Sequence, residues 1–252
     1  MNFETITQRI ENRKSLDFGS IFSKSIALFK EVWLQGFITL LLNFLCMIPV
    51  LIIFYLPLII MGIADPQLMK SEDPPAVLMI AMAVLMPALM VGAMFVVLTL
   101  TAGFYRICKH KDFNDSSADS YFYFFRKPYL GRTLQLSFVS LGLMILGILT
   151  CGLGVIYLAV PFSLFPVFLA FDDELSALEI VKSSFALGNK NWLVIFGLLL
   201  VLGLLAELGV LLCLVGVLFT AMLSKVPAYF VYKEGVGFST DTVESTTSTS
   251  NF

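Results

Sequence analysis

The hydrophobic positions of this chain gather into four long stretches that contain almost no charged residue. A helix needs about 20 apolar residues to cross the hydrocarbon core of a bilayer, and each stretch meets that requirement. The first two are long enough for one crossing each, whereas the last two suffice for two crossings each. The sequence therefore predicts an all-α, polytopic membrane protein of about six transmembrane helices. The stretches cover residues 33–64, 74–105, 133–171 and 191–232.

The third and fourth stretches have to fold back on themselves. Residues 150–154 include two glycines, whose backbone tolerates the angles of a tight turn. In the fourth stretch we expect the break at residues 207–209. Neighbouring helices can satisfy the carbonyl groups that a proline frees, so we interpret the prolines in or beside the spans as kinks and not as ends. These prolines are Pro49, Pro57, Pro87, Pro161 and Pro166.

Composition supports the same class of protein. The chain of 252 residues is 58% hydrophobic and only 13% charged, whereas soluble domains carry about 25% charged residues. So few charges cannot cover a surface that faces water, which indicates a bilayer as the solvent. The net charge of −2 gives no cationic field for a nucleic acid. The four cysteines form no CxxC pair, and we interpret them as small packing residues.

The cations predict the orientation of the chain. Lys and Arg are in excess in the cytoplasmic loops of membrane proteins. In the six-span arrangement, fifteen of the sixteen cations fall on one side, and only Lys70, in the acidic loop 65–73, falls on the other. Both termini are therefore predicted to be cytoplasmic. Residues 1–14 are polar and charged, so the first span would be an uncleaved anchor.

An internal repeat links the first and fourth stretches. Residues 25–41 and 184–200 align at an offset of 159, with eight of seventeen positions identical. The two tryptophans of the chain, Trp33 and Trp192, occupy the same place in this pattern. A weaker copy begins near Tyr121. The predicted units are 17–105, 116–171 and 173–233, all entering the membrane from the same side, within one membrane domain at 17–235.

Each unit is expected to begin with an amphipathic helix that lies in the membrane interface. In the first, Asp17 is a plausible N-cap. In the third, Asp172 or Asp173 would be the cap, and an apolar stripe faces away from Ser183 and other polar residues. That stripe consists of Leu178, Val181, Phe185 and Trp192. The middle helix would cover residues 121–130. Residues 1–16 form a polar segment, and the tail 236–252, rich in Ser and Thr, is expected to be disordered.

These residues resemble a bacterial superfamily of membrane proteins. The pattern comprises Phe171-Asp172-Asp173, Ser176-Ala177, Ser184 and Trp192, followed by two long spans with a small or Gly-rich turn. It looks like the YciC-like inner-membrane proteins and the membrane domain of glycerophosphoryl diester phosphodiesterases. The resemblance implies a six-helix domain in the bacterial inner membrane. These 252 residues do not include a soluble barrel like the one that carries the catalysis of the enzymatic members, so we expect no phosphodiesterase activity and carry over no catalytic residue.

Few residues offer chemistry. His110 is the single histidine, which excludes a multi-histidine metal site within one chain, and no phosphate-binding or nucleophile motif is present. We therefore expect no enzymatic activity, metal or cofactor. Polar residues at membrane depth are the default functional candidates, here Asn43, Glu207 and Lys225. The simpler interpretations are an interhelical hydrogen bond for Asn43, an exposed turn for Glu207 and a snorkelling side chain for Lys225.

Membrane lipids are the expected partners, and a homo-oligomer or a protein partner in the membrane is left open. Two functions compete. The first is a non-enzymatic membrane protein, with envelope or lipid homeostasis as one interpretation, and the second is a transporter of a small or amphipathic molecule. Transport requires Asn43, Glu207 and Lys225, together with Thr99, Thr101 and Gln135, to converge on one cavity. The candidate contacts to lipid headgroups are Arg106, Lys109, Lys111, Arg126 and Lys127.

Overall fold

The computed structural model describes residues 1–64, 76–115, 120–150, 152–211 and 215–238, and every regular element in these ranges is a helix. The predicted acidic loop, Cys151, Cys213 and all but the first three residues of the predicted tail lie outside the described residues. The elements are α1 (Phe3–Asn12), α2 (Phe18–Ala64), α3 (Ala76–Asp112), the 3-10 turn η1 (Tyr123–Phe125), α4 (Lys127–Leu149), α5 (Leu153–Phe171), α6 (Ala177–Lys190), α7 (Trp192–Glu207), η2 (Leu208–Leu211), α8 (Val215–Thr220), η3 (Ala221–Ser224) and α9 (Val226–Gly235).

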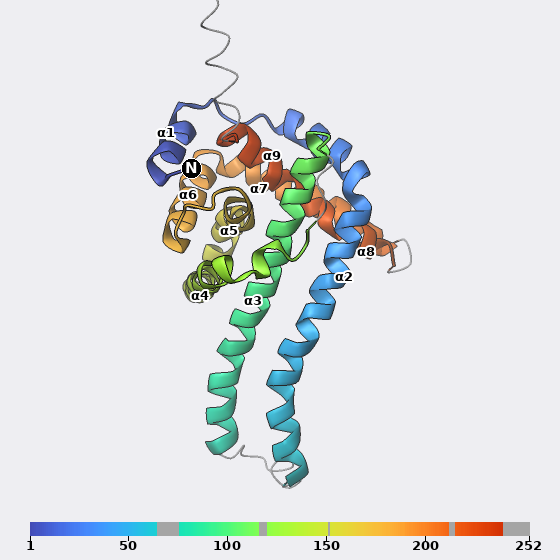
Figure 1. Ribbon diagram of the computed structural model, residues 1–252, viewed down its shortest axis with the longest axis vertical. Helices are drawn as coiled ribbons and strands as arrows, with labels where there is room; N and C mark the ends of the chain where they lie inside the picture. Colours follow the sequence, from blue (N-terminus) through green and yellow to red (C-terminus); the bar gives the residue numbers. More distant parts are fainter. Residues whose placement is uncertain (65–75, 116–119, 151, 212–214, 239–252) are drawn as a thin grey trace, which may run out of the picture.

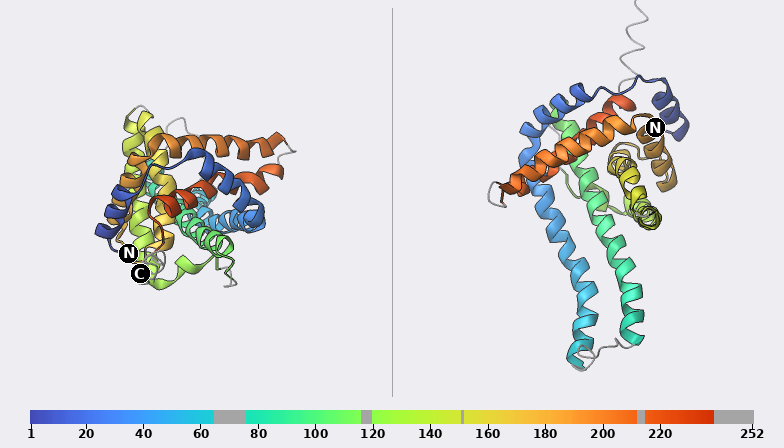
Figure 2. Two further views of the ribbon diagram at one scale, coloured as in Figure 1. Left: turned by 90° about the horizontal axis from the view of Figure 1, so that it is seen from above. Right: turned by 180° about the vertical axis from the view of Figure 1, so that it is seen from behind.

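Two long helices, α2 and α3, form a hairpin whose lower half projects away from the rest of the molecule (Figure 1). The projecting part carries large apolar side chains on its surface, such as Ile53, Ile60 and Ile80, each more than half exposed. A surface of this kind is unfavourable in water and favourable in lipid. The other helices gather around the upper end of the hairpin, where α4, α5 and α7 run across its direction (Figure 2).

Four helices are long and apolar enough to cross a membrane, namely α2, α3, α4 and α5, and α6 with α7 would make a fifth if this pair is one span. The axes of α6 and α7 differ by 92°. The predicted sixth span is divided into α8, η3 and α9, none of which is long enough alone. An all-helical protein with four or five apolar helices is thus confirmed, whereas six spans are not seen in the described residues.

The predicted turn between α4 and α5 is found, and the five prolines lie within helices, as expected of residues that do not end a span. Between α4 and α5, Gly152 has a φ of 81°, and Oγ1 of Thr150 accepts the N–H of Gly154 over 2.9 Å. At the second predicted turn α7 ends at Glu207. All five prolines lie inside helices, Pro49 and Pro57 in α2, and so none of them ends a helix. Pro87 lies in α3, and Pro161 and Pro166 lie in α5.

The two strongest copies of the repeat differ in structure. In the first copy α2 continues through Trp33 without interruption, so the predicted interfacial helix and the first span are one helix. In the second copy Asn191 separates α6 from α7. The residue that aligns with Asn191 at the offset of 159 is Val32, which has no polar side chain to hold the backbone outside the helix. The predicted middle helix is not continuous: it is replaced by the 3-10 turn η1 and the start of α4. Pro128 lies in the first turn of α4, a position where proline favours the beginning of a new helix.

One of the predicted caps is confirmed and the other is wrong. Oδ1 of Asp17 accepts the N–H of Ser20 over 2.6 Å at the start of α2. At α6, however, the cap is Ser176, which forms a capping box with Glu179, and Asp172 and Asp173 lie before it. The box satisfies two free N–H groups reciprocally, which neither aspartate could do from its position.

The buried face of α6 is also different from the prediction. Ser183 is fully buried, as is Ser184, whereas Leu178 is 60% exposed. The side of α6 that carries the small residues Ser184 and Gly188 packs on α5, so closely that a Cβ added to Gly188 would lie 3.2 Å from Val160. Of the predicted apolar stripe, Leu178 is exposed, whereas Val181, Phe185 and Trp192 are half-buried and pack against the hydrophobic core.

Both ends of the described chain belong to the packed core. The predicted polar segment holds α1, whose Ile6 and Ile10 are buried, and Oδ1 of Asn2 accepts the N–H of Thr5 as its N-cap. At the other end, Val236 and Phe238 are buried in the same core. The ordered chain thus extends at least to Phe238, two residues beyond the start of the predicted tail.

Candidate functional site

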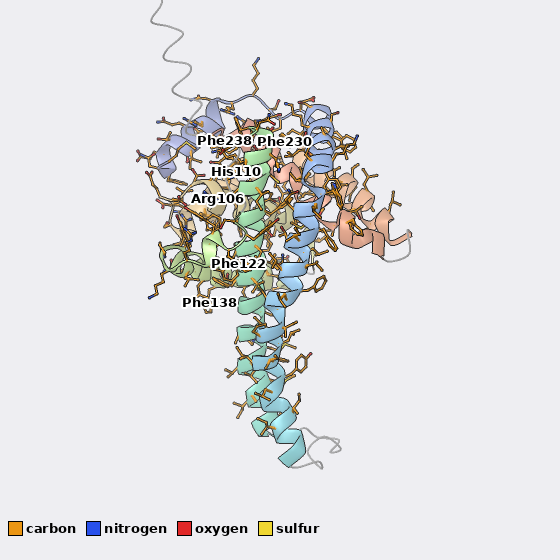
Figure 3. All side chains as sticks on the ribbon, turned by 45° about the vertical axis from the view of Figure 1, so that its right-hand side comes forward. Arg106, His110, Phe122, Phe138, Phe230 and Phe238 are labelled. Atoms are coloured by element: carbon orange, nitrogen blue, oxygen red, sulfur yellow. The ribbon has the colours of Figure 1, made fainter. Side chains whose placement is uncertain are left out.

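A hollow with several basic residues in its lining lies beside the last turns of α3, at the upper end of the hairpin, where Figure 3 places Arg106 and His110. Arg106, Lys109 and His110 follow at helical spacing, so they share one side of α3. The end of α5 forms the opposite wall. We call this hollow of about 190 Å³ the basic recess. Its lining includes Arg106, Lys109, His110, Phe113, Phe171 and Asp173.

Aromatic rings hold the cations of the basic recess in place. The guanidinium carbon of Arg106 lies 3.9 Å from the ring centroid of Tyr123, and that of Arg126 lies 5.3 Å from the same ring. The ammonium of Lys109 lies 4.3 Å from the ring of Phe238 and also approaches Phe171. Cations over ring faces are attracted by the ring quadrupole. The recess therefore presents positive charges in fixed positions rather than on free side chains.

Two carboxylates match in number the two permanent positive charges of the lining, those of Arg106 and Lys109. Asp115 and Asp173 also line the basic recess. Asp173 forms an ion pair of 3.7 Å with Arg132, so part of its charge is already balanced. The basic residues also occupy the last turn of α3, where cations interact favourably with the negative end of the helix dipole. A contribution to helix stability alone is the simpler explanation against which any binding function has to be tested.

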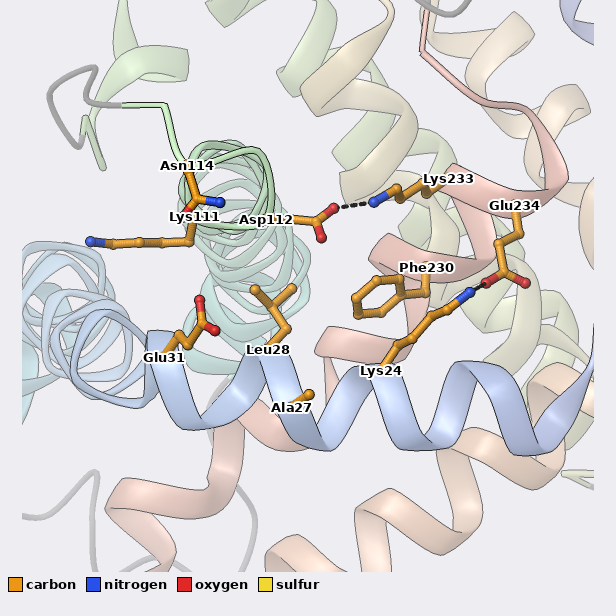
Figure 4. Close-up of a pocket in the computed structure, with 10 residues that line it drawn as sticks. All are labelled: Lys24, Ala27, Leu28, Glu31, Lys111, Asp112, Asn114, Phe230, Lys233 and Glu234. Atoms are coloured by element: carbon orange, nitrogen blue, oxygen red, sulfur yellow. Dashed lines mark hydrogen bonds and ion pairs between the residues drawn. The ribbon is translucent and has the colours of Figure 1, made fainter.

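A second hollow, of about 320 Å³, lies on the other side of α3 (Figure 4). Ion pairs bridge its walls: Lys24 of α2 lies 2.7 Å from Glu234 of α9, and Lys233 of α9 pairs with Asp112 of α3. The predicted headgroup residue Lys111 also lines this hollow, as does Glu31. Two of its three lysines are thus paired with two of its three acids inside the hollow. We interpret it as a polar junction that joins three helices.

Several other cations of the predicted cytoplasmic side bind backbone carbonyl groups. Arg13 donates to the carbonyl oxygens of Lys233 and Glu234, at the end of α9. Lys190 donates to those of Ile10 and others at the end of α1. The last carbonyls of a helix have no partner inside the helix, so such donors satisfy them and oppose the negative end of the dipole. These cations stabilise the fold and are occupied within it.

Arg132 is the most connected of these cations. Its guanidinium donates to four carbonyl groups around the end of α5, at distances between 2.8 and 3.2 Å. The planar fork of an arginine suits this multiple capping better than the single ammonium of a lysine. The acceptors belong to Leu169, Asp172, Asp173 and Leu175.

The Asp172 carboxylate, next to these carbonyls, is fully buried. The hydroxyl of Tyr232 donates to its Oδ2 over 2.7 Å. Burial raises the pKa of Asp172 to about 6, although the hydrogen bond from Tyr232 favours the charged form. Sequence reasoning assigned Asp172 to a cap and did not identify Arg132 or Tyr232. The sequence signal was an acidic pair, Asp172 and Asp173, at the end of an apolar stretch, and such a pair does not distinguish a helix cap from a buried carboxylate.

The polar residues proposed for a transport path do not converge on one cavity. Asn43 donates to the carbonyl of Thr39 in its own helix, where an interhelical hydrogen bond was expected. Glu207 is exposed beside an apolar hollow near the end of α7. Thr99 is buried and donates to Phe95 of its own helix. Lys225 and Thr101, in contrast, share a narrow groove between α3 and α5.

The five predicted headgroup residues are thus divided among three places. Arg106 and Lys109 lie together in the basic recess, and Arg126 reaches it through the ring of Tyr123. Lys111 lines the hollow on the opposite side of α3, and Lys127 is exposed at the start of α4.

Comparison of the chain with protein-family models, curated proteins and solved structures finds no match in any of the three.

Proposed function

We propose that this chain is a non-enzymatic protein of the bacterial inner membrane, with both termini cytoplasmic, that binds the anionic headgroups of lipids in the basic recess. The observation that carries the proposal is the convergence of Arg106, Lys109 and His110, from one side of α3, on one hollow beside apolar helices. Arginine and lysine are the side chains that recognise phosphate. Membership in the YciC-like superfamily is part of the same proposal and rests on the motif around Phe171.

The lengths of α2 and α3 also support a position in the membrane for the helices that run across the hairpin. The apolar parts of α2 and α3, residues 33–64 and 76–105, are roughly 48 and 45 Å long at ~1.5 Å per residue. The hydrocarbon core is only roughly 30 Å thick. An apolar helix that is too long for the bilayer tilts. In a tilted hairpin, the helices that run across it also enter the bilayer at an angle, which agrees with the exposed apolar surfaces of α4 and α7.

Scattered polar residues support lipid binding over transport. A permease needs a polar path, and among the hollows of the described residues given above, Thr101 and Lys225 share one that the other four candidates do not line. Asn43 and Glu207 lie apart from it, each on a different helix. A lipid-binding protein needs no continuous path, because its ligand reaches the binding site from the bilayer.

Purified protein in a neutral detergent tests the proposal. Addition of phosphatidylglycerol should raise the unfolding temperature by several degrees, because a ligand at 100 times its Kd stabilises the folded state by about 2.7 kcal/mol. Phosphatidylcholine, which has no net charge, should have a smaller effect. The double variant Arg106→Gln/Lys109→Gln should lose most of the difference between the two lipids. Lys127→Gln removes one charge outside the recess and is the control.

The outcome is decided by the lipid difference and not by stability itself. If the double variant retains the full preference for phosphatidylglycerol while it is folded, the basic recess is not the headgroup site. If Lys127→Gln lowers the preference as much as the double variant, the effect is one of total charge. Salt should weaken the interaction of the wild-type protein, since part of the recess is exposed to water.

A further inference from the structure

A narrow groove runs along the seam between α3 and α5, at a lower level than the basic recess. On α3 its wall is a single helical stripe that begins at Met94 and ends at Tyr105, a length of roughly 16 Å at ~1.5 Å per residue. On α5 the wall contains Phe162 and Phe165. The groove has a volume of about 100 Å³, and most of its lining is apolar.

Lys225 is the one charged residue in the described lining of this groove. Its backbone is fixed at the upper end, where the hydroxyl of Tyr105 donates to the carbonyl of Lys225 over 3.0 Å. Its side chain is exposed toward the groove, and none of the ion pairs found among the described residues involves it. A lysine beside apolar spans normally needs an anionic partner or access to water.

The hydroxyl groups of Ser140 and Ser163 do not compete for a ligand's negative charge. Ser140 donates to the carbonyl of Leu136, and Ser163 donates to that of Val160, each over 2.7 Å within its own helix. Their protons are therefore engaged. This leaves the ammonium of Lys225 as the principal donor at the end of an otherwise apolar groove, an arrangement that complements a hydrocarbon chain ending in one negative charge.

We propose that this groove holds a segment of one acyl chain of an anionic phospholipid, with its phosphate on Lys225 and the rest of the lipid in the bilayer. The proposal rests on the proposed function only in taking a lipid as the ligand, because the groove and the basic recess have no lining residue in common. The charge is at the end of the groove nearer the basic part of α3. This places the phosphate at headgroup level and the chain toward the membrane interior.

Phosphatidylglycerol with a photoactivatable diazirine in one acyl chain tests this directly. After irradiation of the protein reconstituted in phosphatidylcholine vesicles, peptide mass spectrometry should find attachment between residues 94 and 105 and between 162 and 166. Lys225→Gln should reduce this labelling about tenfold, whereas Lys225→Arg, which keeps the charge, should retain it. Labelling confined to the projecting part of the hairpin, or equal in wild type and Lys225→Gln, would overturn the proposal.

A block of the groove gives a second, independent readout. Ser163→Phe should abolish attachment at residues 94–105 and leave the preference for phosphatidylglycerol at the basic recess unchanged. If Ser163→Phe does not fold, the pair Lys225→Gln and Lys225→Arg still decides the matter. Loss of labelling in Lys225→Gln but not in Arg106→Gln/Lys109→Gln supports the groove even if the recess proposal fails. The opposite result supports the recess and rejects the groove.

Discussion

Tyr232 of α9 donates a hydrogen bond of 2.7 Å to the carboxylate of Asp172 just after the end of α5, and both side chains are fully buried. A carboxylate in such a place is costly when charged, since burial removes its hydration. Burial is the main cause that raises the pKa of Asp172, to about 6 from the ordinary 3.8. The hydrogen bond from Tyr232 recovers part of that cost in the charged form.

The raised pKa of Asp172 predicts a pH dependence of stability. Between pH 4 and pH 6 the folded protein holds this proton more tightly than the unfolded chain, so the free energy of unfolding falls as the pH rises and levels off above about 6. The contribution is roughly 3 kcal/mol at ~1.4 kcal/mol per pKa unit. Asp172→Asn, which keeps an acceptor for Tyr232, should remove it. Thermal unfolding of both proteins in detergent from pH 4 to 7 measures the difference, and parallel curves would contradict the assignment.

Arg132 is predicted to be a major stabilising residue. Replacement by Gln leaves several carbonyl groups at the end of α5 without their donor, and removal of one partner from a buried charged network costs about 3 kcal/mol or more. Arg132→Lys should recover only part of this, because one ammonium cannot reach all the acceptors. Lys127→Gln, which alters an exposed residue of the same helix, should stay within about 0.5 kcal/mol of wild type. Equal unfolding temperatures for Arg132→Gln and Lys127→Gln would show that the capping is dispensable.

The elements of the fold that could be predicted are those coded by neighbouring residues. Long apolar runs predicted the helices, Gly152 indicated the turn between α4 and α5, and Asp17 was correctly predicted as an N-cap. The features that could not be predicted depend on contacts between distant parts of the chain. Whether a cation such as Arg132 faces lipid or caps a helix is decided by packing, and the positive-inside pattern is the same in both cases.

Asn191 shows how one such contact changes an element. The repeat at an offset of 159 predicts the same structure at Trp33 and at Trp192, yet only the second copy is broken, by 92°. Oδ1 of Asn191 accepts the backbone N–H of Leu16 over 3.0 Å, from a segment 175 residues away. No local pattern contains that partner. In the sequence, the break between α6 and α7 is marked only by the replacement of an apolar residue, Val32 in the first copy, by the polar Asn191 in the second.

This difference can be tested by exchange. Asn191→Val, which introduces the residue of the first copy, should destabilise the protein by about 1–3 kcal/mol, because it leaves a buried N–H of Leu16 without an acceptor. Asn191→Asp keeps an acceptor oxygen and should lose less. Unfolding temperatures of the two variants in detergent provide the comparison. A loss for Asn191→Asp as large as that for Asn191→Val would assign the effect to the amide group instead of the acceptor.

The orientation of the chain is open to labelling. In a background without the four native cysteines, Lys70→Cys should react with a membrane-impermeant maleimide on intact cells, because its loop is predicted to be outside. Lys127→Cys should react only after the membrane is permeabilised. Labelling of both positions from the same side would contradict the predicted topology. The opposite pattern would invert it, and the basic recess would then face away from the cytoplasm.

Two chain segments that follow α7 approach each other closely at Gly209 and Gly216, and a larger side chain at Gly209 should therefore be destabilising. A Cβ added to Gly209 would lie 2.8 Å from the backbone oxygen of Gly216 and closer still to the hydroxyl of Thr220. That hydroxyl donates to the carbonyl of Ala206 over 2.6 Å, so it cannot move away without losing a hydrogen bond. Gly209→Ala should therefore lower the free energy of unfolding by about 1–3 kcal/mol. Gly203→Ala, where no heavy atom lies within 4 Å, should be neutral or stabilising by up to about 1 kcal/mol. Opposite shifts of the unfolding temperature in this pair identify the turn as a packed contact, whereas equal shifts would mean that the segments do not meet at Gly209.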